Sequence, residues 1–251
     1  MTSPPDSPMN IAKSQFINTT ADVQMEPSEV PVSAGVANLK VLFQNAKIAF
    51  PVTLTIQTSS GKHRGVHMSR LVRASSRRNA AGIEEWLKLI CKEVNRTQPG
   101  SIATCKFEMP FSDQFSPVTI RTTESGSTTY QLVATGMTAC PCSKKMIGIG
   151  HMQRAEIVLI LRSRKTLDLS RVIGRLGECF SAMPDEEMKR AQEAVKILRA
   201  QENAKFAEDL VRDTVKRFPD ALYVSARCFE SIHAHDAVAT WSKKPGWTPS
   251  L

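Results

Sequence analysis

The sequence predicts an α+β fold in which antiparallel sheets carry helices on one face. Short segments of alternating apolar and polar residues, typical of half-buried strands, flank longer segments whose apolar residues recur at helical spacing. The order strand, strand, helix, helix, strand, strand is predicted in the first half of the chain and again in the second, and such blocks of strands and helices are typical of an α+β architecture. No strong repeat of residues accompanies this order, so the predicted duplication rests on the elements alone.

In the first half, strands are predicted over residues 38–44 and 51–59, helices over 67–75 and 79–100, and strands over 101–111 and 127–136. The longer helix has the clearest pattern, because its apolar residues recur on one face and Pro99-Gly100 follow its end. These apolar residues are Ile83, Trp86, Leu87, Ile90 and Val94.

In the second half, a strongly apolar strand is predicted over residues 155–163 and a helix over 168–182, with Asp168 as its N-cap. Two further helices are predicted over 185–201 and 203–218, and a closing strand over 221–232. Residues 1–35 are rich in Pro, Ser and Thr and show no period, which predicts a flexible N-terminal arm or an extended strap. The remainder divides into one module over 36–135 and a second over 136–251.

Composition narrows the class of protein. With 251 residues, 41% of them hydrophobic, the chain can bury a large core, yet no apolar run approaches the roughly 18 residues of a membrane helix. No secretory signal opens it, and six cysteines are too few for a disulfide scaffold of this length. We therefore expect a soluble cytoplasmic protein with no membrane partner. The net charge of +9 predicts an anionic partner, either nucleic acid or a phosphorylated small molecule.

A basic cluster, "GKHRGVHMSR" at residues 61–70, lies where a predicted strand gives way to a helix. It holds Lys62, His63, Arg64, His67 and Arg70. Helix N-termini and arginine side chains both suit phosphate, because N–H donors match its oxygens. The spacing of a Walker loop is absent. A solvated basic turn is the alternative interpretation.

A second motif, "TACPCSKKMIGIGHMQR" at residues 138–154, contains Cys140, Cys142 and His151. Cys140 and Cys142 are separated by a single proline and are interpreted as a poor pair of ligands for one ion. No second cysteine pair completes a zinc ribbon. One cysteine with a distant histidine is half of an open catalytic site, and two buried inert thiols are the alternative.

A third motif, "FESIHAHDA" at residues 229–237, brings Glu230, His233, His235 and Asp236 close together in the sequence. Two imidazoles and a carboxylate can bind a first-row metal or act in general acid–base catalysis. In a strand, alternation would place His233 and His235 on one side and Glu230 on the other, unless the strand bends. A polar surface loop is the alternative.

Taken together, these stretches resemble the type IB GTP cyclohydrolase family, which includes the archaeal enzyme of methanopterin synthesis. The resemblance covers roughly residues 36–241 and rests on "RGVHMSR", "TACPCS" with "GHMQR", "ENAKFAEDLVRD" and "FESIHAHDA". It implies a tunnelling fold with two β-β-α-α-β-β modules per chain, and a homotetramer whose active sites form between subunits.

The resemblance also implies a metal site of Cys140, His151, His233 and a glutamate. Family members often carry Lys-Arg-Pro-Asp-Glu where this sequence has "KRAQE", which places Glu193 at the ligand position, although the Pro-Asp is replaced. The ion would be divalent: zinc, iron(II) or manganese. Cys140 and His151 would serve catalysis as ligands, while Glu230 and His235 would move protons.

For the substrate, the resemblance implies that Glu208 anchors the guanine N–H edge, since a carboxylate accepts from two adjacent donors. Arg64, His67 and Arg70 would contact the triphosphate, which gives the positive charge a small-molecule explanation. Asp236 is expected to have a structural role.

The implied reaction is hydrolysis of the guanine imidazole ring of GTP. Formate leaves, and 7,8-dihydroneopterin triphosphate results as the first step of tetrahydrofolate synthesis. The same reaction ending in a 2′,3′-cyclic phosphate is an alternative. A nitrile reductase of the same fold would have no role for Cys140, His151 and His233 together. A metal-containing nucleic-acid-binding protein would interleave aromatic residues with its basic cluster, and residues 61–70 contain none, so no nucleic-acid partner is expected.

Overall fold

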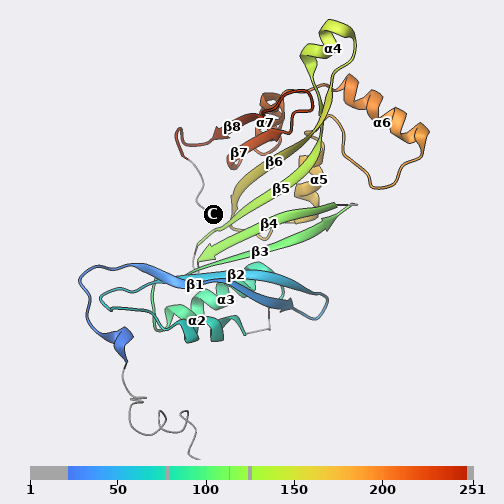
Figure 1. The fold of residues 1–251 in the computed structure, drawn as a ribbon. Helices are drawn as coiled ribbons and strands as arrows, with labels where there is room; N and C mark the ends of the chain where they lie inside the picture. Colours follow the sequence, from blue (N-terminus) through green and yellow to red (C-terminus); the bar gives the residue numbers. More distant parts are fainter. Residues whose placement is uncertain (1–21, 77–79, 113, 124–125, 248–251) are drawn as a thin grey trace, which may run out of the picture.

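The protein is built on one antiparallel sheet of eight strands, in the order β1 to β8 (Figure 1). The computed structural model describes residues 22–76, 80–112, 114–123 and 126–247. The strands are β1 (Ser33–Gln44), β2 (Ala49–Ser59), β3 (Ile102–Phe111), β4 (Gln114–Thr123), β5 (Thr128–Ala139), β6 (Met152–Ser163), β7 (Ala221–Cys228) and β8 (Ala237–Ser242). The predicted α+β class with an antiparallel sheet is confirmed.

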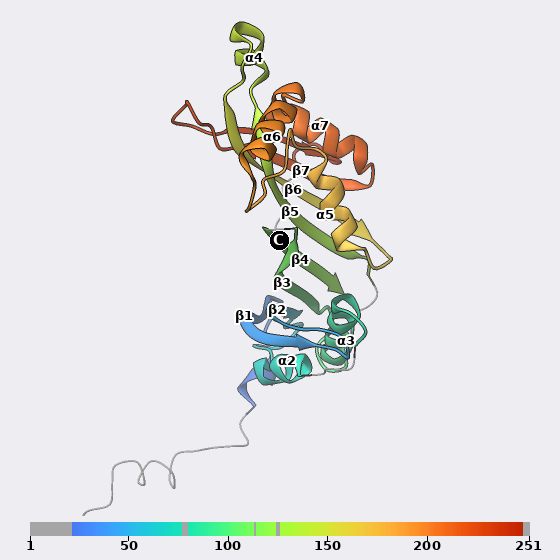
Figure 2. The same cartoon turned by 90° about the vertical axis from the view of Figure 1, so that its right-hand side faces the viewer.

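Apart from a short helix beyond the far end of the β5–β6 hairpin, the helices lie against one face of the sheet (Figure 2). The helices are α2 (Met68–Ser75), α3 (Ile83–Asn95), α4 (Pro141–Ile147), α5 (Leu169–Gly177), α6 (Arg190–Glu202) and α7 (Ala207–Arg217), preceded by the short helix η1 (Val23–Met25). Two strands, helices and two strands thus occur twice, in agreement with the two-module plan of a tunnelling fold. In the described ranges, no helix combines the length and apolarity needed to cross a bilayer.

Four elements were not predicted from the sequence: the three-residue helix η1, β4, β8 and α4. Pro117 interrupts the strand pattern of β4, β8 has six residues, and α4 has seven, so each gives a weak signal. The strand predicted over 221–232 ends at Cys228, and the helix predicted over 168–182 ends at Gly177. The strand predicted over 127–136 is β5, which pairs with β6 and runs through the predicted boundary at 135/136. The division into modules at that residue stays a prediction.

The core forms where the helices cover the sheet. Alternate residues of β2, among them Val52, Leu54 and Ile56, are buried, and the predicted apolar face of α3 packs within the same core. All five side chains of that predicted face are buried. Burial of each large apolar side chain contributes about 1.5–3 kcal/mol, so the amphipathic pattern of α3 specifies its position.

A buried hydrogen bond connects the half of the chain that contains β1–β4 to the half that contains β5–β8. Tyr130 of β5 donates through its hydroxyl to Glu84 Oε1 of α3 over 3.0 Å, and Tyr130 is fully buried. Burial raises the pKa of Tyr130, and the nearby Glu84 carboxylate raises it further. The hydroxyl therefore stays a donor, and the carboxylate keeps a partner in the interior.

Residues 1–21 of the predicted arm lie outside the described residues. The segment that follows, residues 22–28, is called here the N-terminal strap. It lies against residues 60–65, because Gly65 N–H donates to Gln24 O, Arg64 N–H to Glu26 O and Ser28 N–H to Lys62 O. Strand β1 then begins at Ser33, within the range predicted for the arm.

Candidate metal centre

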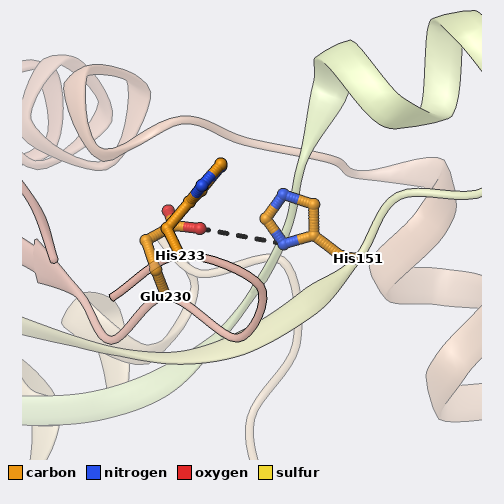
Figure 3. Close-up of side chains that lie close together, drawn as sticks. All are labelled: His151, Glu230 and His233. Carbon is orange, nitrogen blue, oxygen red and sulfur yellow. Dashed lines mark ion pairs between the residues drawn. The ribbon is translucent and has the colours of Figure 1, made fainter. Parts of the chain in front are cut away.

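Three side chains of the second half converge beyond the start of β6: His151, Glu230 and His233 (Figure 3). Each offers one ligand atom, and these atoms all lie within 4.8 Å of one another. Across the part of the chain that the structure describes, no other three His, Cys, Asp or Glu side chains come this close. Two histidines and a carboxylate are a donor set for zinc, iron or manganese.

His151 is positioned by the strand pair β5–β6. Ala139 pairs with Met152, and Cys140 N–H then donates to His151 O over 2.9 Å, so these two residues continue the ladder. Opposed residues of an antiparallel pair share a face, with Cβ atoms about 4.5–5.5 Å apart. A Cβ on Gly150 would lie 2.5 Å from Cys140 O, so only glycine allows this close approach.

Glu230 and His233 are carried by the loop between β7 and β8. The loop is closed at its base by Arg227 and Asp236, whose Nε and Oδ2 atoms lie 2.7 Å apart. Phe229 N–H donates to Arg154 O and extends the pairing of β7 with β6 by one residue. Because the strand ends there, Glu230 turns toward His151 instead of away from it.

The carboxylate of Glu230 lacks a partner on one oxygen. Oε2 lies 3.8 Å from His151 Nδ1, is buried, and has no hydrogen-bond partner among the described residues. Oε1 lies 3.5 Å from Gln153 Nε2, and His151 Nδ1 lies 3.2 Å from Ser231 Oγ. An unsatisfied buried acceptor costs about 1–3 kcal/mol, and more when charged.

A divalent metal fits this group. Two ligands of a tetrahedral zinc ion at about 2.0–2.1 Å lie roughly 3.4 Å apart. The 3.8 Å between Glu230 Oε2 and His151 Nδ1 is close to that spacing. An ion would also supply the positive charge that the buried Oε2 lacks.

Comparison with known proteins identifies the family. The family model described as "Type I GTP cyclohydrolase folE2" matches residues 20–239. The chain belongs to the type I GTP cyclohydrolase FolE2 family. The family predicted from the motifs is thereby confirmed.

The chain is similar to proteins named FolE2 and to proteins named MptA. "GTP cyclohydrolase FolE2 1" of Dechloromonas aromatica is 30% identical, and the match covers 82% of this chain and 88% of the relative. "GTP cyclohydrolase MptA" of Pyrococcus furiosus is 26% identical over 88% of this chain and 98% of the relative. Among solved structures, the uricase from Arthrobacter globiformis matches with a TM-score of 0.49 at 10% identity, over 88% of this chain and 96% of the uricase.

The ligand set predicted for this FolE2-family chain is only partly brought together. His151 and His233 meet, and Glu230, predicted to move protons, completes the group. Cys140 lies opposite His151 in the ladder but does not belong to the group of three. Glu193 is exposed on α6, eight residues before Gln201, or about 12 Å along the helix axis. Gln201 itself contacts Gly150, so Glu193 lies well away from His151. The roles of Cys140 and Glu193 as ligands stay predictions.

His235 and Glu208 lie at the same end of the molecule as the group. The rings of His233 and His235 stack, with centroids 5.2 Å apart and planes 14° apart. Glu208 is exposed in the first turn of α7. Burial raises the pKa of the Cys228 thiol, a hydrogen bond from Thr138 lowers it, and the Glu230 and Glu208 carboxylates raise it further.

Two contacts of the group were missed at the sequence level: Gln153 and Ser231. Gln153 follows His151 by two positions, so strand periodicity would have placed both side chains on one face. Ser231 gives no such signal, because its position depends on the course of the β7–β8 loop. Asp236 has the expected structural role, since it binds Arg227.

The predicted triphosphate cluster lies elsewhere in the same chain. The cluster lies at the start of α2: Arg64 and His67 precede the helix, and Arg70 is in its first turn. Figures 1 and 2 place α2 and α4 at opposite ends of the molecule. Arg64 pairs with Glu26 at 2.5 Å, and His67 Nε2 lies 3.6 Å from Asp22 Oδ2. One chain therefore does not bring its own cluster to its own metal group.

Proposed function

We propose that this protein is a metal-dependent GTP cyclohydrolase that hydrolyses the guanine imidazole ring of GTP, releases formate and forms 7,8-dihydroneopterin triphosphate. The observation that carries the proposal is the group of His151, Glu230 and His233 with its unpartnered carboxylate oxygen. The reaction is proposed from the family, because relatives that match most of the chain bear the name GTP cyclohydrolase.

His151, Glu230 and His233 would hold the divalent ion, with Cys140 as a further ligand from the neighbouring strand. The chemistry that the bound ion supplies is a water whose pKa is lowered toward neutrality, so that it can attack C8 of guanine without a strong base. Zinc, iron(II) and manganese all suit imidazole and carboxylate donors. In the ligand set predicted from the resemblance, Glu193 takes the carboxylate position instead of Glu230.

The surrounding residues orient the reactants and move protons. Gln153 lies beside Oε1 of Glu230, which leaves Oε2 directed toward His151, and Ser231 Oγ would give up its contact with His151 Nδ1 when that atom binds the ion. His235, which stacks on His233, would deliver a proton to a ring nitrogen as its C–N bond breaks. Glu208 accepts hydrogen bonds from the guanine N–H edge.

We further propose a homotetramer whose sites form between subunits. A second copy would bring the basic cluster to the metal group, because α2, beside which the cluster lies, and α4 are at opposite ends of one chain (Figures 1 and 2). The metal end also exposes apolar side chains, with Met146 and Ile147 on α4 at 82% and 73% and Leu198 on α6 at 61%. Isolated exposed apolar residues are ordinary, but a concentration of them favours a protein partner.

The cytoplasm is the proposed compartment, because all six cysteines, every one of them described, are free thiols. The product is proposed as the triphosphate. The 2′,3′-cyclic phosphate is the alternative, because relatives named MptA match as broadly as those named FolE2.

The test supplies metal-free protein with GTP and Zn²⁺, Mn²⁺ or Fe²⁺ in turn. We expect formate and, after oxidation, a fluorescent pterin with at least one ion, and the phosphate content of that pterin identifies the product. No formate with any of the three ions would refute the proposal. His233→Ala and Cys140→Ala should abolish metal retention, whereas the control Cys142→Ala, an exposed thiol beside the site, should retain metal and lose less activity.

A further inference from the structure

The N-terminal strap, residues 22–28, is fixed by its backbone beside the basic cluster of residues 61–70. Three backbone hydrogen bonds connect the two segments, and Pro27 and His63 form an antiparallel bridge. The approach is close at Gly65, where an added Cβ would lie 3.3 Å from the Gln24 side chain. These contacts involve main-chain atoms, so they do not depend on the charges of the strap.

The strap places two carboxylates on the cations predicted to bind triphosphate. Glu26 Oε2 lies 2.5 Å from Arg64 NH1, and Asp22 Oδ2 lies 3.6 Å from His67 Nε2. The two acids are four positions apart in the strap, and their cationic partners are three positions apart in the cluster. Two of the three predicted phosphate contacts are thus covered by anions of the same chain.

The two ion pairs differ in distance and in exposure, and an incoming anion could displace both. Arg64 and Glu26 are largely exposed, at 64% and 50% of their side chains, and exposed pairs contribute little stability. His67 Nε2 is buried and has no hydrogen-bond partner among the described residues, because Asp22 is too distant to provide one. An incoming phosphate oxygen at hydrogen-bond distance would satisfy that atom better than Asp22 does.

We propose that Asp22 and Glu26 are internal occupants of the triphosphate-binding cluster, which the substrate's polyphosphate must displace before it can bind. The inference rests on the proposed function, in that the displacing anion is the triphosphate of GTP. Because the backbone keeps both carboxylates beside the cluster, they return as soon as the anion leaves. The strap therefore lowers the affinity for any polyphosphate and favours ligands with several phosphate groups, which can displace both acids at once.

The test measures binding of inorganic tripolyphosphate to the full chain by calorimetry, together with KM for GTP. Glu26→Gln and Asp22→Asn keep the shape of each side chain and remove its charge. Each should tighten tripolyphosphate binding about three-fold, and the double variant about ten-fold, as expected for losing a weak exposed pair. KM for GTP should fall in parallel, with a smaller gain for inorganic monophosphate.

Glu29→Gln is the matched control, because Glu29 is exposed just beyond the strap and forms no ion pair with a described residue. If Glu29→Gln tightened tripolyphosphate binding equally, the effect would come from net charge alone, and the proposal would be overturned. So would unchanged or weaker tripolyphosphate binding in both strap variants. In an Arg64→Gln background, Glu26→Gln should have no further effect, and a full three-fold gain there would equally contradict direct occupancy. Tripolyphosphate binding needs no turnover, so this inference and the cyclohydrolase proposal can fail separately.

Discussion

Replacing Glu230 with glutamine should stabilise the metal-free protein and reduce the stabilisation that bound metal provides. The Glu230 side chain is 11% exposed, and its Oε2 has no hydrogen-bond partner among the described residues. In metal-free protein a buried, unpartnered charged acceptor is a cost. In metal-loaded protein the same atom is a ligand. Glutamine keeps the shape, removes the charge and binds the ion less well.

The magnitudes follow from these two roles. Removal of the buried charge should raise the free energy of unfolding of the metal-free variant by at most about 1–3 kcal/mol, because the amide still leaves a polar atom at the position of Oε2. At a metal concentration of about 100 Kd, bound ion stabilises the wild type by about 2.7 kcal/mol. A loss of about 100-fold in metal affinity leaves the variant only about 0.4 kcal/mol of this stabilisation. For a chain of this size, 1 kcal/mol corresponds to roughly 2–4 °C in Tm.

Thermal unfolding with chelator and with added Zn²⁺ or Mn²⁺ measures both effects. We expect Glu230→Gln to melt above wild type in chelator and to gain about 2.3 kcal/mol less than wild type from the added metal. Glu186→Gln, an exposed acid of the same half, should melt with wild type in both buffers. A metal-free variant less stable than wild type would mean that Oε2 has a favourable partner. An equal metal-induced shift in variant and wild type would mean that Glu230 is not a ligand.

Two further predictions concern backbone packing and buried thiols. Gly150→Ala should reduce the metal content of purified protein, because its Cβ would push against the Cys140 carbonyl at 2.5 Å, whereas Gly174→Ala, where the nearest side-chain atom is 3.4 Å away, should retain metal. Equal metal content in the two variants would contradict the packing argument. Burial raises the pKa of the Cys105 thiol from 9.0 to about 12. The folded state therefore keeps a proton that the unfolded state releases, so stability is full below pH 9 and is lost toward pH 12, by about 1.4 kcal/mol per pH unit. Urea unfolding at pH 8 to 11 should show a smaller loss in Cys105→Ala than in Cys142→Ala, and equal losses would refute the assignment.

The sequence predicts best what local patterns determine. The apolar face of α3 is buried as predicted, because helical spacing of large apolar residues leaves one solution for a helix on a sheet. The strand pairs β1–β2 and β5–β6 are long and alternate strongly, so most of their residues were identified. β8 and α4 are too short to have a period, and their structure depends on the neighbours they pack against.

The metal group shows most clearly what local sequence patterns do not predict. His151 and His233 are 82 positions apart, and no local pattern indicates that they meet. Strand alternation placed Glu230 on the opposite side from His233, but β7 ends at Cys228, and the loop that follows turns Glu230 inward. Motif resemblance supplied the two histidines. The third side chain of the group depends on the course of a loop that is held at its base by Arg227 and Asp236.

The hydrogen bond from Tyr130 to Glu84 has a consequence for the repeated plan of the chain. The order of two strands, helices and two strands occurs twice, which suggests two domains that could each fold alone. Cutting the chain between β4 and β5 would leave Glu84 in the interior of one fragment without its donor, and would end the sheet at an unpaired, largely buried strand. Such fragments would each lack part of their core, so we expect the duplicated halves to unfold together as one cooperative unit.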